Sequence, residues 1–137
     1  MIEPALIQIR FSDIDLMGHV NNAVYLSYLE YTRVHYFNQM LDENWDWETN
    51  GIILAHTEIS YRIPIVLNDK PEIQMKIGRV GDKSFTFHYS IFVDGKIMSN
   101  ASSTLVCYNT LLKSSITIPL LMRESFMQLE KFCGLLR

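Results

Sequence analysis

One stretch of the chain reads Asn22-Ala-Val-Tyr-Leu-Ser-Tyr-Leu-Glu-Tyr-Thr-Arg-Val-His-Tyr-Phe-Asn-Gln-Met-Leu41 and contains neither proline nor glycine. Its apolar and aromatic residues go most of the way round a helix. Its polar residues keep to a narrow strip around Ser27, Glu30, Arg33 and Asn38. A helix this apolar has to be buried on most sides. The stretch therefore predicts one long central helix, with Asn21 or Asn22 capping its first turn.

Strand-like patterns lie on both sides of this helix. Residues 5–11 alternate before it, and four alternating segments follow it, at 51–63, 72–80, 84–93 and 96–109. In the first of the four, one face is predicted to carry Ile53, Ala55, Thr57, Ile59, Tyr61 and Ile63. The last two are joined by Asp94-Gly95, a pair typical of a tight hairpin turn with positive φ angles.

This order of elements predicts an α+β architecture. A single antiparallel sheet of about five strands would wrap around the long helix, and a short amphipathic helix over residues 120–132 would close the chain. Such a sheet leaves open edges and one uncovered flank, which a second copy of the chain could cover. We therefore expect a homodimer or homotetramer.

The composition narrows the class of protein. The chain has 137 residues, of which 48% are hydrophobic and 20% charged, and its formal net charge is −3. These values are typical of one globular domain, here residues 1–137. A nucleic-acid binder would carry clustered basic residues, so nucleic acid is disfavoured as a partner. We find neither a leader pattern nor an apolar run of membrane-spanning length, and we expect a cytoplasmic protein that does not bind membranes.

The two cysteines and the common site motifs give little chemistry. Cys107 falls in the strand predicted over 96–109 and Cys133 at the end of the predicted terminal helix. Two such cysteines make neither a disulfide framework nor a metal-ligand pattern, so we expect reduced, structural thiols. Metal, nucleophile-elbow and phosphate-loop motifs are absent from the sequence. We therefore expect no metal and no cofactor.

Polar groups gather instead in the loop before the long helix, Phe11-Ser-Asp-Ile-Asp-Leu-Met-Gly-His-Val-Asn-Asn22. Gly18 permits a tight turn, and the start of the helix offers unpaired N–H groups to a developing oxyanion. Acyl transfer needs such donors together with a base or nucleophile. By composition alone the same residues also fit ordinary turn and cap positions, so both interpretations stay open at this point.

The segment from Asp15 to Arg33 closely resembles the signature of the hotdog-fold thioesterases. It is similar to the branch that contains 4-hydroxybenzoyl-CoA thioesterase, bacterial long-chain acyl-CoA thioesterases and plant acyl-ACP thioesterases. Thr57-Glu-Ile-Ser-Tyr-Arg-Ile-Pro64 resembles the second strand of that family, and the resemblance extends over residues 7–119. It implies a hotdog fold and hydrolysis of a fatty-acyl or aryl-acyl thioester to free acid and CoA.

The resemblance also implies roles for individual residues. Asp15 would be the catalytic carboxylate, acting as nucleophile or general base, and the Asn22 N–H would polarise the thioester oxygen. His19 matches a histidine of the acyl-ACP enzymes, but Met17 stands where those enzymes have asparagine. The substrate would further contact Gly18, Asn21, Tyr25 and Tyr28. For the two tyrosines, simple packing remains the alternative.

Three other functions fit the same resemblance. The chain could act on acyl-ACP, with a carrier protein in place of CoA as the thiol. It could be a hotdog dehydratase or hydratase, although the arrangement of the Asp15–Asn22 loop favours hydrolysis. It could also bind acyl thioesters without turning them over. In each case the acyl-CoA or acyl-ACP is a substrate or ligand, and CoA is no cofactor.

Overall fold

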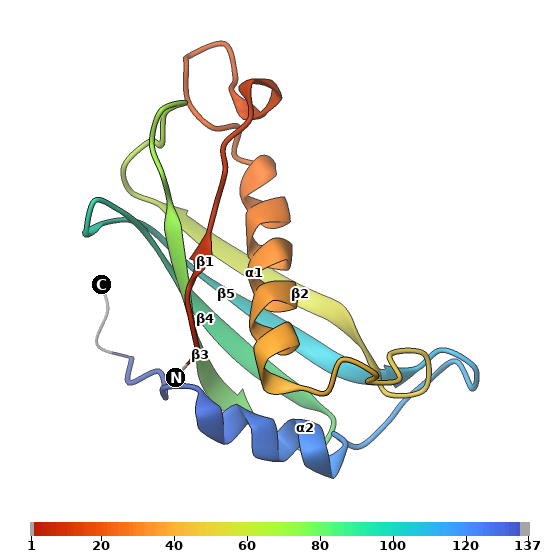
Figure 1. Ribbon diagram of the computed structural model, residues 1–137. Helices are drawn as coiled ribbons and strands as arrows, with labels where there is room; N and C mark the ends of the chain where they lie inside the picture. The colour runs from red at the N-terminus through yellow and green to blue at the C-terminus, as the bar shows by residue number, and fades with distance from the viewer. Residues whose placement is uncertain (1, 135–137) are drawn as a thin grey trace.

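The computed structural model describes residues 2–134 and contains one curled antiparallel sheet in the order β1-β3-β4-β5-β2 (Figure 1). The strands are β1 (Ala5–Leu6), β2 (Gly51–Tyr61), β3 (Glu72–Val80), β4 (Ser84–Val93), β5 (Lys96–Asn109) and β6 (Ser114–Ser115). The short β6, which the sequence did not predict, pairs with the end of β5. β1 and β2 form the two edges of the path.

The meander from β3 to β5 confirms the predicted strands. All three have the bounds that the alternating pattern predicted. Asp94 and Gly95 have φ angles of 51° and 78°, as a two-residue hairpin turn of the primed type requires. The predicted α+β hotdog architecture is therefore correct in its central part.

The first strand is much shorter than the predicted 5–11. Only Ala5 and Leu6 pair with β3, and Phe11–Asp13 form a turn of 3-10 helix. The Asp13 carboxylate accepts a hydrogen bond of 3.0 Å from the Arg10 N–H. A side chain that bonds to its own backbone nearby competes with strand pairing, so the chain leaves the sheet before the predicted end.

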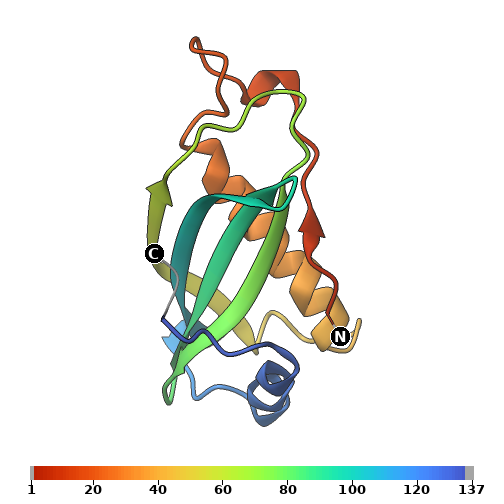
Figure 2. The ribbon, with the colours of Figure 1, turned by 90° about the vertical axis from the view of Figure 1, so that its left-hand side faces the viewer.

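The long helix α1 (Val24–Met40) lies along the concave face of the sheet (Figures 1 and 2). It begins slightly later than predicted, and neither asparagine serves as its cap, because the cap position is Ala23. Asn21 instead closes a turn just before the helix, where its Oδ1 accepts a hydrogen bond of 2.8 Å from the Ala23 N–H. Short amide side chains favour such turns.

One chain does not bury α1 on most sides, contrary to the prediction. Leu26 and Val34 are 48% and 52% exposed, because the sheet covers only one flank of the helix. Arg33, which the sequence pattern placed in the solvent-facing strip, is only 9% exposed and lies against the sheet. The buried and exposed stripes of the helix are therefore not those that apolar periodicity predicts.

β2 contains a bulge that reverses the predicted faces of its first half. Leu54 pairs with Leu105 and His56 with Thr104, which leaves Ala55 without a partner in the register. Because side chains alternate along a strand, one extra residue exchanges the two faces. Ile53 and Ala55 therefore do not share a face with Thr57 and Ile59, contrary to the prediction. The inner positions of the first half belong to Ile52 and Leu54.

The end of the chain is also less helical than predicted. Helix α2 (Leu120–Ser125) and a 3-10 turn η2 (Phe126–Gln128) cover one end of the sheet (Figure 2). The Ile77 N–H then donates to the Glu130 carbonyl and the Phe132 N–H to the Ile77 carbonyl, so the tail runs along the edge of β3 that β1 leaves open. Cys133 lies outside any helix and is exposed.

The core fills the space between α1, the inner face of the sheet and α2. Aromatic rings dominate it: the ring centroid of Phe87 lies 5.7 Å from that of Phe37 on α1, and that of Phe85 lies 4.7 Å from that of Phe126. Cys107 lies on β5, as predicted, and its thiol is free and buried. Across residues 2–134, neither helix has the length and apolar character needed to cross a bilayer.

Candidate active site

The loop between β1 and α1 folds around the carboxylate of Asp15. Its Oδ1 accepts hydrogen bonds from the N–H groups of Met17, at 2.9 Å, and His19, at 3.2 Å. The Asp15 N–H donates in turn to the His19 carbonyl at 2.7 Å. Gly18 completes the turn with a φ of +81°, a conformation that costs glycine little. In the described chain the second carboxylate oxygen, Oδ2, accepts no protein hydrogen bond.

A second loop, residues 62–71, holds this turn against the rest of the molecule. His19 forms an isolated bridge with Val66, and the Val20 N–H donates to the Ile65 carbonyl at 2.8 Å. Both loops lie together beyond the N-terminal end of α1 (Figures 1 and 2). The turn itself and the loop of residues 62–71 therefore hold Asp15 in place.

A surface pocket of about 240 Å³ opens where the two loops meet the start of α1. Its lining contains Asp15, His19, Val20, Asn22 and Tyr25, together with residues 61–64. Four of the residues predicted from sequence, Asp15, His19, Asn22 and Tyr25, are thus brought to one place. The wall formed by residues 61–64 was missed as a site, although this segment was recognised as part of the second strand.

The Asn22 N–H is an unused donor at this pocket. The N–H groups of Asn21, Ala23 and Val24 donate to the Asp13 carbonyl, the Asn21 side chain and the Asn21 carbonyl. Within residues 2–134 the Asn22 N–H donates to no protein oxygen. An unpaired backbone donor at a helix start is suited to bind an oxyanion.

Two tyrosines hold the Asn22 peptide in place. The Tyr61 hydroxyl donates to the Asn22 carbonyl at 3.0 Å, and the Tyr61 ring meets the Tyr25 ring edge to face, with centroids 4.9 Å apart. Burial raises the pKa of both phenols, so they stay neutral at physiological pH. Only a neutral phenol can make the Tyr61 hydrogen bond.

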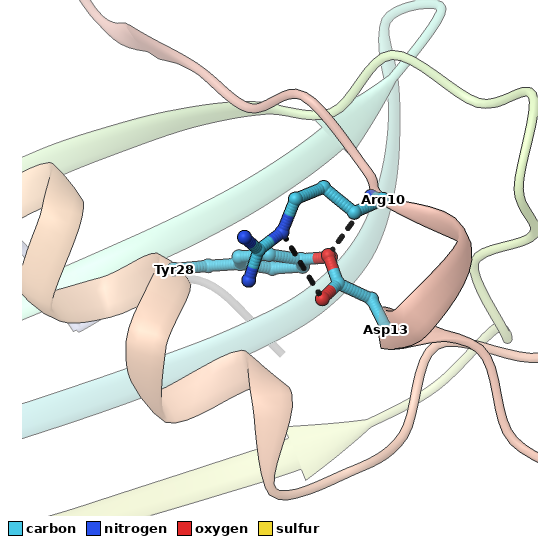
Figure 3. Close-up of polar contacts among 3 residues, drawn as sticks. All are labelled: Arg10, Asp13 and Tyr28. Atoms are coloured by element: carbon cyan, nitrogen blue, oxygen red, sulfur yellow. Dashed lines mark hydrogen bonds and ion pairs between the residues drawn. The ribbon is translucent and has the colours of Figure 1, made fainter.

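Tyr28, a predicted substrate contact, lies elsewhere. Its hydroxyl donates to Oδ2 of Asp13 at 2.7 Å, and the Nε atom of Arg10 lies 3.9 Å from Oδ1 of the same carboxylate (Figure 3). Burial alone would raise the pKa of Asp13, but hydrogen bonds from Arg10 and Tyr28 and the Arg10 charge hold it below its usual value. Burial and the neighbouring Asp13 raise the pKa of Tyr28 strongly. Arg10, Asp13 and Tyr28 line a different pocket.

Two further predicted contacts have structural positions. Gly18 and Asn21 do not line the pocket; the first allows the turn and the second shapes the entry to α1. Among the described residues, no three histidine, cysteine, aspartate or glutamate side chains converge to hold a metal ion. The polar groups at the pocket are the Asp15 carboxylate, the His19 side chain and the Asn22 N–H, together with Tyr61 and Arg62.

A curled antiparallel sheet wrapped around a long helix is the hotdog architecture, and a solved thioesterase shares this fold. The sequence profile of the Thioesterase-like superfamily matches residues 9–128. The chain belongs to this superfamily, and it is an enzyme of the thioester hydrolase class.

Individual relatives support this assignment. The long-chain acyl-CoA thioesterase FadM of Escherichia coli is 27% identical over 128 residues, which cover 91% of this chain and 97% of that protein. The uncharacterised protein YsmA of Bacillus subtilis is 32% identical, but only over 61% of this chain and 56% of its own length. A Thermus thermophilus thioesterase crystallised with coenzyme A and zinc is 29% identical, with a TM-score of 0.79 over 90% of this chain and 96% of that one.

Proposed function

We propose that the chain hydrolyses acyl-CoA thioesters to the free acid and CoA in the pocket at the start of α1. The observation that carries this proposal is the meeting of the Asp15 carboxylate and the unpaired Asn22 N–H in one pocket. FadM, whose name specifies a long-chain acyl-CoA substrate, aligns over nearly the whole chain, and the Thermus enzyme was crystallised with coenzyme A.

In the proposed reaction the thioester oxygen accepts a hydrogen bond from the Asn22 N–H. Asp15 takes a proton from water while the water oxygen attacks the carbonyl carbon. The resulting oxyanion collapses, the C–S bond breaks, and the thiolate of CoA takes up the proton. Attack by the Asp15 carboxylate itself, followed by hydrolysis of the mixed anhydride, uses the same groups. An oxyanion donor of this kind contributes about 3 kcal/mol to the transition state.

His19 and Tyr25 complete the proposed site. The His19 backbone fixes Asp15 through two hydrogen bonds, and its imidazole lines the pocket next to the thioester. Tyr25 forms part of the wall through its ring. Tyr28 is not part of this proposal, because its hydroxyl is bound to the buried Asp13.

We further propose that two copies of the chain pair along β2. This strand is an edge of the sheet, and apolar residues on it and on the adjacent flank of α1 are exposed. These residues are Leu26, Val34, Ile53 and Leu54. An open edge with exposed apolar side chains is a template for pairing with another strand. Such a homodimer would also cover the flank of α1 that one chain leaves open.

The catalytic proposal is tested by Asp15→Asn. The amide cannot act as base or nucleophile, so we expect kcat for thiol release from a panel of acyl-CoA esters to fall by about 10²–10⁴-fold. Asp94→Asn is the matched control, because asparagine suits that exposed turn position and should leave kcat unchanged.

Three outcomes separate the rival functions. Full activity of Asp15→Asn would remove Asp15 from the mechanism. Hydration of enoyl-CoA by the wild-type protein without thiol release would identify a hydratase. Tight binding of acyl-CoA without either reaction, at high protein concentration, would indicate a binding protein.

A further inference from the structure

Two peptide groups meet at the Cα atom of Asn22, and the first of them contains the free donor. This first group consists of the Asn21 carbonyl and the Asn22 N–H. Its carbonyl accepts a hydrogen bond of 2.9 Å from the Val24 N–H, at the start of α1. Because a peptide group is planar and trans, the Asn22 N–H points opposite to that carbonyl. The first turn of the helix thus sets the direction of the donor within the loop.

The second peptide group contains the Asn22 carbonyl and the Ala23 N–H. The Ala23 N–H donates to Oδ1 of Asn21 at 2.8 Å, a bond inside the loop. The Asn22 carbonyl accepts a hydrogen bond of 3.0 Å from the hydroxyl of Tyr61, the last residue of β2. Among the hydrogen bonds of these two peptide groups within residues 2–134, this one alone joins them to the sheet.

Tyr61 is itself held on both sides. Its ring packs edge to face on the ring of Tyr25, which is buried in the first turn of α1. Directly after Tyr61, the N–H groups of Arg62 and Ile63 both donate to the Met98 carbonyl of β5, at 3.1 and 3.0 Å. The ring therefore has a fixed place relative to the sheet, and its hydroxyl passes that place on to the Asn22 backbone.

Solvent also reaches this hydrogen bond, because Tyr61 is 49% exposed. Without the phenol, a water molecule could donate to the Asn22 carbonyl, so the loop should keep its fold. Water is not attached to the sheet, however, and cannot hold the backbone of residue 22 against the pocket wall. An oxyanion donor works only when it is preorganised at the place where charge develops.

From these observations we propose that Tyr61 is a positioning residue for catalysis. Its hydroxyl holds the Asn22 backbone so that the free N–H stays aimed at the thioester oxygen. This inference rests on the proposed acyl-CoA hydrolysis and adds to it a group that does not touch the reacting atoms. Charge on the thioester oxygen develops in the transition state, so loss of the Tyr61 hydroxyl should affect kcat more than substrate binding.

The test is Tyr61→Phe, which removes the hydroxyl and keeps the ring that packs on Tyr25. We expect kcat for thiol release to fall by about 5–10-fold, as the loss of one hydrogen bond predicts, with KM nearly unchanged. Tyr108→Phe is the matched control and should leave kcat unchanged. Tyr108 pairs with Gly51 at the other end of β2, and its hydroxyl makes no hydrogen bond within residues 2–134.

A binding measurement separates positioning from direct contact and from loss of folded protein. A fluorinated ketone in place of the thioester adds water to give a hydrate that resembles the tetrahedral intermediate, whereas a thioether analogue lacks the carbonyl. Calorimetry should show that Tyr61→Phe binds the fluoroketone analogue about 5–10-fold more weakly and the thioether analogue with unchanged affinity. Loss of folded protein would lower the stoichiometry of binding and leave both affinities as they are.

Three results would overturn the inference while leaving acyl-CoA hydrolysis intact. They are a wild-type kcat in Tyr61→Phe, an equal weakening of both analogues, and unchanged affinity for both analogues with a reduced stoichiometry. The second result would place Tyr61 in contact with the substrate, and the third would make its role purely structural. Absence of thiol release from every acyl-CoA by the wild-type protein would instead contradict the proposed function itself.

Discussion

Two neighbouring aspartates of the same loop have different surroundings, and these separate their roles. Asp15 has one carboxylate oxygen bound by backbone N–H groups and faces a pocket. Asp13 is buried and bound by Tyr28 and Arg10. Sequence alone could locate the polar loop, because glycine, histidine and two amides precede an apolar helix. It could not separate the contacts of Tyr25 from those of Tyr28, because both lie on the buried side of the helix.

The Asp13 cluster yields a stability prediction. Tyr28→Phe removes the 2.7 Å hydrogen bond to Asp13 and leaves a buried carboxylate with one partner fewer, so the free energy of unfolding should fall by about 1–3 kcal/mol. Urea denaturation at pH 7 measures this loss. Tyr31→Phe, at an exposed position of the same helix, is the control and should change little.

The same cluster predicts the direction of a pH effect. The folded state holds the pKa of Asp13 below its usual value, so the folded protein binds the proton less readily than the unfolded chain. The resulting stabilisation is present above the unfolded pKa and is lost as the pH falls through the folded pKa. Between pH 5 and pH 2, Asp13→Asn should therefore lose less stability than the wild-type protein. An equal loss in both proteins would exclude Asp13 as a contributor.

At the scale of elements, sequence patterns succeeded where each strand had two strand neighbours. β3, β4 and β5 alternate over most of their length, and their bounds were predicted correctly. The pattern failed at the edges: Asp13 draws the chain away from β1, and the bulge at Ala55 reverses the faces of β2. Periodicity also gave no sign that Arg33 is buried, because a charged residue on a helix is ordinarily solvent-exposed.

The β4–β5 hairpin allows a test of one predicted turn. Gly95 has a φ of +78° and open space around its Cα atom, so Gly95→Ala introduces backbone strain without a clash. We expect the free energy of unfolding to fall by about 1 kcal/mol. Asp94→Asn in the same turn should be neutral, since asparagine tolerates positive φ. An unchanged stability of Gly95→Ala would show that this turn relaxes to another type.

For the whole molecule, the exposed flank of α1 and the open β2 edge lead to one prediction about assembly. Analytical ultracentrifugation should show a dimer. Ile53→Glu should weaken it, because the substitution replaces an exposed apolar residue of the edge strand with a charge. Leu112→Glu, at an exposed position in the loop after β5, should leave the dimer unchanged. A wild-type monomer would contradict pairing along β2.

The two cysteines have a practical consequence for enzymology. Burial raises the pKa of the Cys107 thiol to about 11, whereas Cys133 is exposed. A disulfide dye that counts liberated CoA would therefore also react with Cys133, giving a background of one equivalent per chain even before catalysis begins. Replacing Cys133 with serine would remove that background, and the unmodified residue offers a single attachment point for a fluorophore.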